Sequence, residues 1–427
     1  MNRKVFFTGL NVNVGLKSNN TISCIFTNNL EALVQIYLWL FLNIFLLMKM
    51  KKLLTIFILL IFLSCSDKST NSIDDNNLIL LKVGEKADTT QFFKDHFVLD
   101  NVVPVETTDN FLVGSGFKRF ITYKNKLIIL DRNAAVFVVD YASGKVDSYI
   151  KNVGRGPGES RKICDMCFDE KTETIILFND FQQLLFYDLN GKFIKSESFK
   201  KLYETIIYDN GDVLFYNDGE GYSCYPYKID KYNLQDKTLR IIGRNDRLDF
   251  NYRLFGNHMV KSKNIWFGTP ADFELFKYEN SKIESIYRLE PKTPLLTKEK
   301  MKLSQTDSRR FSDEISTIMY GIAAIRETSH YLVFRSSKVG FFVLNKETNE
   351  IFWENYVHET SLGLKLMNYF PHNGDDDRIM FVVDPIEWIH LRKDANMIGL
   401  SESLIEKIES FSIEEDSNPI LVFYREK

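Results

Sequence analysis

The chain has 427 residues, of which 44% are hydrophobic, 14% aromatic and 26% charged, and its formal net charge is -3. These values exclude wholesale disorder and a polytopic membrane protein over most of the length. They also disfavour nucleic acid as a partner, because phosphate binding requires a clustered basic excess. The 35 Phe and 20 Tyr, with only 9 Pro, favour strands, whose pleated surfaces accommodate flat side chains. We therefore expect a β-rich protein with a substantial core.

The segment before residue 65 has the features of a secretory signal. A basic region comes first and is formed by Lys49, Lys51 and Lys52. The apolar run 53–63 follows, and it is shorter than the roughly 18 residues that a membrane span needs. Residues 62–65 read Phe-Leu-Ser-Cys and resemble the lipobox of bacterial lipoproteins. This resemblance implies cleavage before Cys65 and diacylation of its sulfur, which predicts an outer-membrane lipoprotein that faces either the periplasm or the exterior.

A lipobox functions only near the N-terminus of the translated chain. We therefore expect residues 1–47 to be a mis-annotated upstream extension, residues 48–64 to be the signal peptide, and residues 65–90 to be a flexible tether. The alternative is a membrane hairpin made by the two apolar runs 32–47 and 53–63.

A unit of about 46 residues recurs after the tether, and repeats of this length indicate propeller blades or solenoid units. The strand-like segments 128–131 and 136–140 recur as 176–179 and 184–188, each pair being followed by a glycine turn. We expect every unit to contain a strand, a short turn, a second strand, a hairpin and a third strand. The second strands end at Asp140, Asp188, Asn233, Glu279 and Asn345. The spacings are 48, 45, 46 and 66 residues, so the last interval contains an insertion.

Helical segments are expected in two places. The insertion falls in the polar stretch 297–310, for which we expect a surface helix or loop. A last unit contains the strands 378–383 and 418–424, and residues 401–411 lie between them. Within 401–411, an amphipathic helix is predicted by the spacing of Leu404, Ile405, Ile408 and Phe411.

Turn residues support the strand assignments. Ser143-Gly144, Asn190-Gly191 and Asn210-Gly211 lie between apolar runs, where positive φ angles suit two-residue hairpins. Six units over residues 91–427 fit an all-β fold, a six-bladed β-propeller with four-stranded antiparallel blades and short helical insertions. Radial closure also hides the strand edges that an open sandwich would expose.

Three short motifs resemble a known family. The segment Gly154-Arg155-Gly156-Pro157-Gly158-Glu159 is similar to the G-x-G-P-G-E motif of the six-bladed, NHL-like β-propeller lipoproteins of Bacteroidetes. Residues 102–107 are similar to an early strand of that family, and residues 418–424 to its closing strand. The resemblance implies a propeller on a lipid anchor, with no assigned reaction. We also expect the C-terminal strand and the strand near Val102 to complete the same blade.

The glycine motif has a structural and a functional interpretation. A nucleotide-binding loop is disfavoured because Pro157 interrupts the motif and a strand, not a helix, is expected after it. The glycines are better explained by a tight crossing between two blades. Arg155 and Glu159 are our candidate ligand-binding residues on the axial face, and the alternative is a mutual or interblade ion pair.

Other chemistry-bearing residues are weighed against structural roles. Cys164 and Cys167 have metal-ligand spacing, but no second cysteine pair completes a zinc site. We therefore expect two small buried residues on opposite faces of a strand. A disulfide between them is permitted but not required. Calcium could use the oxygen donors of 372–377, although a solvated turn is the simpler interpretation. Turn hydrogen bonding is expected for Asp131, Asp140 and Asp188, and core packing, rather than a sugar platform, for Trp266, Trp353 and Trp388.

The functional expectation is a binding or scaffold module of the cell envelope, attached to the membrane by its lipid. We predict no cofactor and no catalytic residue. One alternative is a metal-dependent enzyme of the propeller lactonase or lyase type, with a divalent metal at the axis. Another is an accessory protein of an outer-membrane glycan-uptake system, whose partner would be an envelope protein or a glycan.

Overall fold

The computed structural model describes residues 78–84 and 92–427, apart from internal gaps of which the longest are 218–227, 245–257, 292–299 and 367–371. The expected signal segment and Cys65 therefore lie outside the described residues. Cys224 lies in one of the gaps.

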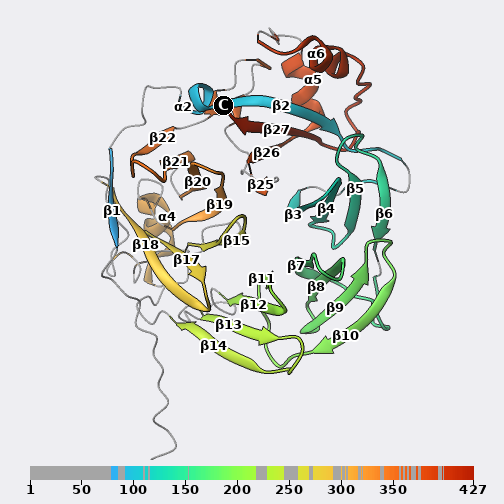
Figure 1. Cartoon of the computed structure of the whole chain (residues 1–427), viewed down its shortest axis with the longest axis vertical. Coiled ribbons are helices and arrows are strands. Elements are labelled where there is room, and N and C mark those ends of the chain that lie inside the picture. The colour runs from blue at the N-terminus through green and yellow to red at the C-terminus, as the bar shows by residue number, and fades with distance from the viewer. Residues whose placement is uncertain are drawn as a thin grey trace, which may run out of the picture. The chain divides into compact units, whose positions relative to one another are not determined.

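Six antiparallel sheets are arranged around a central axis like the blades of a propeller (Figure 1). Each blade has four antiparallel strands, and the innermost strands of neighbouring blades contact one another around the ring. The prediction of an all-β, six-bladed β-propeller is therefore confirmed.

The blades follow one another in chain order. Within each blade, the strands are named in order from the axis outward. Blade 1 contains β3 (Phe117–Tyr123), β4 (Lys126–Asp131), β5 (Val136–Asp140) and β6 (Val146–Ile150). Blade 2 contains β7 (Ile163–Asp169), β8 (Thr174–Asn179), β9 (Gln183–Asp188) and β10 (Phe193–Ser198). Blade 3 contains β11 (Thr205–Asp209), β12 (Asp212–Asn217), β13 (Lys228–Asn233) and β14 (Leu239–Arg244).

Blade 4 contains β15 (Met259–Lys261), β16 (Ile265–Phe267), β17 (Glu274–Glu279) and β18 (Lys282–Pro291). Blade 5 contains β19 (Ala323–Glu327), β20 (Tyr331–Arg335), β21 (Phe341–Asn345) and β22 (Ile351–Glu354). Blade 6 contains β25 (His372–Asn373), β26 (Arg378–Val383), β27 (Ile420–Glu426) and β2 (Phe97–Pro104). The five residues expected to end a repeated strand are the last residues of β5, β9, β13, β17 and β21, which confirms the repeat.

Blade 6 closes the ring with strands from both ends of the chain. Strand β2 pairs antiparallel with β27, with Val102 opposite Val422, and β27 pairs in turn with β26. In Figure 1 the blue β2 and the red β27 lie side by side. The expected sharing of one blade by these two segments is confirmed.

One further strand joins the propeller from outside the repeats. Strand β1 (Ile79–Val83) pairs parallel with β18 at the outer edge of blade 4, with Leu81 opposite Leu289. Both of these side chains are buried in the core between blades 4 and 5. This strand falls within residues 65–90, the range expected to be a tether, so the folded sheet begins before residue 91.

The chain also forms short helices and a small hairpin outside the six blades. They are α2 (Phe92–His96), α4 (Ser308–Ile315), α5 (Pro385–Arg392), α6 (Glu402–Glu409) and the pair β23 (Val357–His358) and β24 (Lys365–Leu366). Helix α6 confirms the predicted amphipathic helix, since Leu404 and Ile408 are buried and Ser401 caps its N-terminus. The insertion agrees with the expected surface helix or loop, since Lys300, Leu303 and Thr306 are helical and α4 follows from Ser308, with Phe311 buried. None of the helices in the described part of the chain combines the length and apolarity needed to cross a bilayer.

The core consists of six apolar clusters, each filling the space between two neighbouring blades. The middle strands are covered on both faces, so their sequences are continuous apolar runs, as in β5 and β8. The tryptophans expected in the core, Trp266, Trp353 and Trp388, are buried.

The turns carry the recurring aspartates. The carboxylate of Asp131 accepts a hydrogen bond from the Ala135 amide at 2.7 Å. Asp140 accepts one from the Ser143 amide at 2.9 Å, and Asp188 accepts one from the Lys192 amide at 2.9 Å. Hydrogen bonds from the Ser143 hydroxyl and amide lower the pKa of Asp140. The predicted turn role of these aspartates is confirmed.

Candidate functional site

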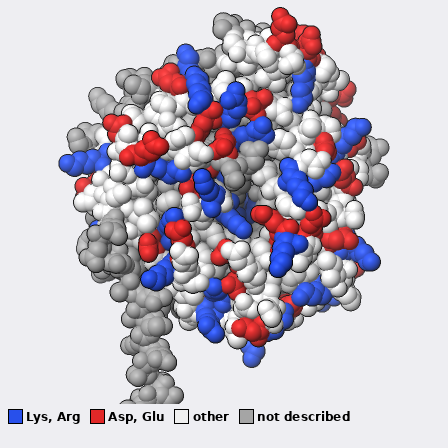
Figure 2. Space-filling model, in the orientation of Figure 1, with Lys and Arg blue, Asp and Glu red and all other residues white. Residues whose placement is uncertain are grey.

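A cavity of about 110 Å³ lies at the axis of the propeller, against the innermost strands of blades 1 to 5. Apolar residues such as Phe120, Met166 and Ile207 form part of its wall. Its lining also includes the polar side chains of Arg119, Thr122, Glu170, Lys261, Ser262 and Arg326. In the space-filling view, Lys and Arg side chains border the hollow at the centre of the ring (Figure 2).

Irregularities in the inner strands set which residues reach this cavity. The pairing of β3 with β4 shifts register between Phe117 and Arg119, and that of β7 with β8 shifts between Ile163 and Asp165. Strand β19 also has one extra residue, between Ala323 and Arg326. An extra residue in one strand re-aims the side chains that follow it. The residue after each shift is charged: Arg119, Asp165 and Arg326.

Backbone strain accompanies the shift in β19. Ala324 has a φ of 52°, in the left-handed region that a residue with a Cβ atom seldom adopts. Such conformations cluster where a side chain must be held in a particular place. Here Ala324 lies two residues before Arg326, whose side chain lines the cavity.

Arg119 and Asp165 form a buried ion pair between blades 1 and 2. The Arg119 Nε and Nη2 atoms donate to the two carboxylate oxygens of Asp165 at 2.6 and 2.7 Å. The same carboxylate accepts a hydrogen bond from the Ile206 amide of blade 3 at 2.8 Å. Both residues are only 2% exposed. One carboxylate therefore connects three blades and compensates the charge of Arg119.

Lys261 projects from the end of β15 and is half-buried. Its Nζ donates to the carbonyl oxygen of Tyr208 at 3.1 Å, across from blade 4 to blade 3. The Nζ also lies 5.8 Å from the centroid of the Tyr208 ring. Within the described part of the chain, this ammonium has no carboxylate at ion-pair distance.

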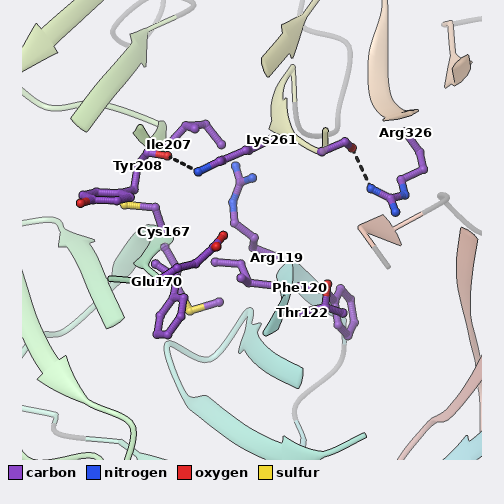
Figure 3. A pocket seen from close by; sticks show the side chains of 13 residues that line it. Arg119, Phe120, Thr122, Cys167, Glu170, Ile207, Tyr208, Lys261 and Arg326 are labelled. Carbon is purple, nitrogen blue, oxygen red and sulfur yellow. Dashed lines mark hydrogen bonds between the residues drawn. The ribbon is translucent and has the colours of Figure 1, made fainter. Parts of the chain in front are cut away.

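Arg326 comes from blade 5 and is 1% exposed. Its Nε donates to the carbonyl oxygen of Arg378 at 3.0 Å, and its Nη1 donates to Ser262 Oγ at 2.7 Å. Figure 3 shows Lys261 directed toward Tyr208 and Arg326 on the opposite side of the view, where its dashed hydrogen bond joins Ser262. Three blades thus deliver three cations to one cavity.

The remaining titratable groups of the lining are uncharged or peripheral. Burial and a hydrogen bond with Asp169 raise the pKa of Tyr208 to about 12, and burial raises the pKa of Cys167 even further above its usual range. Both groups are therefore neutral at physiological pH. Glu170 is exposed, and Figure 3 shows its side chain at the side of the cavity opposite Arg326. The site offers cationic hydrogen-bond donors.

The predicted ligand-binding residues lie elsewhere, on the loop that connects β6 to β7. Arg155 is exposed, and the Glu159 carboxylate accepts a hydrogen bond from the Gly156 amide at 2.7 Å. Neither residue lines the axial cavity. A ligand role for this pair stays a prediction.

The glycines of this loop meet local packing demands. A Cβ atom on Gly154 would lie 2.0 Å from a carboxylate oxygen of Glu159. Gly158 has a φ of 75°, and a Cβ atom there would lie 2.7 Å from the ring of Phe193. The loop crosses from β6 of blade 1 to β7 of blade 2, and of its three glycines Gly158 alone has a positive φ. Pro157 is exposed at the tip of the loop.

The prediction for Cys164 and Cys167 needs a correction. The strand is bulged at Cys164, since Ile163 pairs with Asn179 and Asp165 with Phe178. The extra residue changes the alternation, so both cysteines pack against the apolar cluster between blades 2 and 3 rather than on opposite faces. Both thiols are free.

Metal ligands do not gather in the described residues. No group of three or more His, Cys, Asp or Glu side chains that could hold a metal ion occurs among them. Residues 374–376 of the candidate calcium loop lie outside the described residues, while Asp377 is exposed.

The sequence interpretation missed the three cations. A signal was present, because Arg119 and Arg326 each interrupt an apolar strand, in the segments FKRFITY and AAIRE. A charged residue inside an apolar run is uncommon unless it is paired or functional. That these side chains line one cavity follows only from the positions of the blades in the structure.

Comparisons with known proteins agree with the fold. The family described as Domain of unknown function (DUF4934) matches residues 88–425, and the chain belongs to this family. A candidate exported protein from Bacteroides fragilis has a similar crystal structure, with a TM-score of 0.65 and 19% identity, covering 82% of this chain and 99% of that one. A member of the duf4221 family from Bacteroides vulgatus has a TM-score of 0.50 and 11% identity, covering 78% and 99%. No curated protein matches significantly.

Proposed function

We propose that this DUF4934 propeller is a lipid-anchored binding module of the cell envelope whose axial cavity receives a small polar ligand. The observation that carries the proposal is the cavity itself, whose lining includes Arg119, Lys261 and Arg326 from three different blades. A concave site with a few convergent polar groups is the usual form of a small-molecule site.

The burial of these cations supports binding over a purely structural role. Removing a charged group from water is unfavourable unless a partner compensates it. Asp165 compensates Arg119, but Lys261 is anchored only to a neutral carbonyl in the described residues. A ligand that pairs with the remaining positive charge would offset this unfavourable term.

Envelope location is supported by sequence. The lipobox-like residues 62–65 imply lipidation at Cys65, and the loop 154–159 resembles the motif of the Bacteroidetes propeller lipoproteins. The Bacteroides fragilis structure of similar fold is named as a candidate exported protein. Two acyl chains suffice for stable anchoring, so no membrane span is required.

Fatty-acid labelling tests the anchor. The full chain would be expressed in a Bacteroidetes host, fed an alkyne fatty acid and fractionated. We expect the wild-type protein to be labelled and membrane-bound, and Cys65→Ser to lose both properties. Cys164→Ser is the matched control and should behave as wild type. Label retained in Cys65→Ser, or a tryptic peptide from residues 2–47 in the mature protein, would contradict the proposal.

Ligand-induced stabilisation tests the cavity. The purified full-length protein would be melted in the presence of a panel of small anionic, neutral and cationic compounds. A ligand that binds only the folded state raises Tm in proportion to its occupancy. Thr122→Trp fills the cavity wall and should abolish the shift, whereas Lys124→Trp, on the exposed turn nearby, should preserve it. A panel without any stabilising compound would refute the binding proposal.

A further inference from the structure

We propose that β1 is a detachable strap and that the outer edge of blade 4 is an acceptor site for it. The site takes an extended peptide segment that carries apolar side chains at alternate positions. Its occupant in this structure is the chain's own segment Ile79–Val83. The proposal goes beyond the axial cavity, and only its last consequence, the reach of the tether, rests on the lipid anchor proposed above.

The acceptor site recognises the backbone and two side chains of β1. Residues 79–83 pair in register with residues 287–291 of β18. Leu81 and Val83 are 2% and 3% exposed and belong to the apolar cluster between blades 4 and 5. Leu80, on the other face of the strand, is 52% exposed. These are the features of strand addition, in which backbone pairing gives affinity and alternate side chains give specificity.

A hydrogen bond fixes the end of the strap to the next blade. The indole Nε1 of Trp353, in β22 of blade 5, donates to the carbonyl oxygen of Gly84 at 3.2 Å. Strand β1 also contacts β22 directly. In Figure 1 the blue β1 lies along β18 at the outer edge of the ring. The strap therefore lies in the seam between blades 4 and 5.

Three observations indicate that the strap is separable from the propeller. Blade 4 has its four antiparallel strands without β1, whose own pairing is parallel. The family match starts at residue 88, so β1 lies outside the domain that the family shares. Five paired residues and two buried side chains hold the strap, against the entropy lost in ordering the same segment. Short edge elements with few buried contacts open at a lower free energy than the core.

Release of the strap would lengthen the tether. Residues 66–78 separate Cys65 from β1, whereas residues 66–91 separate it from α2. Helix α2 is the next element docked on the propeller, through its buried Phe92 and Phe93. At roughly 3.5 Å per residue, the greatest reach is about 50 Å with the strap docked and about 95 Å with it released. The strap therefore sets how far the propeller extends from its anchor.

Hydrogen exchange of the purified full-length protein tests whether the strap detaches. We expect the hydrogen-bonded amides of β1 to exchange about tenfold or more faster than those of β17 in the same sheet, because β1 opens without unfolding the blade. Leu81→Ser with Val83→Ser removes both buried side chains and should raise exchange in β1 to the rate of an unpaired chain, with β17 unchanged. Leu80→Ser with Lys82→Ser, on the exposed face, is the matched control and should behave as wild type.

Two exchange results would overturn the proposal. One is wild-type β1 amides that exchange as slowly as those of β17, since the strap would then open only with the whole blade. The other is loss of protection in β17 together with β1 in the Leu81→Ser, Val83→Ser variant, which would make β1 an integral part of blade 4. The wild-type measurement is decisive even where that variant fails to fold.

A peptide supplied in trans tests the acceptor site. The probe is a fluorescent peptide with the sequence of residues 78–85, added to the full-length Leu81→Ser, Val83→Ser variant. We expect it to bind this variant and to raise its Tm. Binding to wild type should be weaker by about tenfold or more, because β1 occupies the site there. A peptide that carries both serines should not bind. Failure of the native peptide to bind the folded variant, or equal binding to wild type, would contradict the acceptor site.

Energy transfer tests the reach. The lipidated chain would be placed in vesicles that contain a dansyl-labelled lipid, and transfer from the tryptophans would be measured. We expect less transfer in the Leu81→Ser, Val83→Ser variant than in wild type, and equal transfer would refute the lengthening of the tether. Label retained in Cys65→Ser would refute the anchor but leave the exchange and peptide results in force, so the two proposals fail separately.

Discussion

The carboxylate of Asp165 is the most informative single position for the stability of this propeller. It accepts two hydrogen bonds from Arg119 and one from the Ile206 amide, and so links blades 1, 2 and 3. Substitution Asp165→Asn keeps the shape of the side chain and one oxygen acceptor. It removes the negative charge that faces a guanidinium only 2% exposed.

The expected loss follows from that burial. Removing one partner of a buried ion pair destabilises a protein by about 3–5 kcal/mol, because the other charge is left uncompensated in a poor solvent. A typical domain has a net stability of roughly 5–15 kcal/mol. We therefore expect Asp165→Asn to lose about a fifth or more of the free energy of unfolding.

Urea unfolding of the full chain, followed by the fluorescence of the buried tryptophans, measures this loss as a lower midpoint. Glu173→Gln is the matched control. It breaks the ion pair with Lys124, which spans the same two blades but is 66% and 49% exposed, so the midpoint should not move.

A double variant separates charge from packing. Arg119→Met combined with Asp165→Leu removes both charges and leaves apolar groups of similar size. If the uncompensated charge causes the loss, this variant should recover most of the stability lost in Asp165→Asn. A double variant no more stable than Asp165→Asn, or a single variant that loses under about 1 kcal/mol, would refute the reasoning.

Three further predictions concern the stability of the propeller. Deleting residues 418–427 removes β27, in which five consecutive side chains are buried, and should cost about 10 kcal/mol, enough to abolish the cooperative melt; an unchanged Tm would contradict ring closure. Gly158→Ala should lower Tm by several degrees, since the φ of 75° and the Phe193 ring both oppose a Cβ atom; a rise would sink this account. His330 has its pKa raised above 6.5 by the hydrogen bond with Glu426 and by the Glu347 charge, against Lys346. Protonated His330 therefore makes a small contribution to the free energy of unfolding, which is complete below pH 6.5 and is lost as pH rises through the higher folded pKa. His330→Gln should flatten the plot of stability against pH in that range. An unaltered plot would contradict this prediction.

The repeat was readable from the sequence because it is set locally. Each blade needs apolar strands covered on both faces, and turns that accept aspartate, asparagine or glycine, so the pattern recurs every 45 to 48 residues in the regular units. The closing strand and α6 were readable for the same reason. The exact start of the folded sheet was not, since β1 joins the edge of blade 4 from outside the repeated pattern.

The candidate site was not readable in the same way. The loop 154–159 drew attention as a motif, yet the structure explains its glycines by contacts with Glu159 and Phe193. The cavity instead uses Arg119, Lys261 and Arg326, which are distant in sequence and belong to no motif.

The sequence by itself determined the ring of six blades, because burial and turn chemistry act on neighbouring residues. Only the tertiary structure decided which side chains reach the axis. That choice depends on the alternation of faces along each inner strand, which a single bulge reverses, as it does at Cys164. It also depends on the closure of the ring, which brings cations from blades 1, 4 and 5 into one cavity.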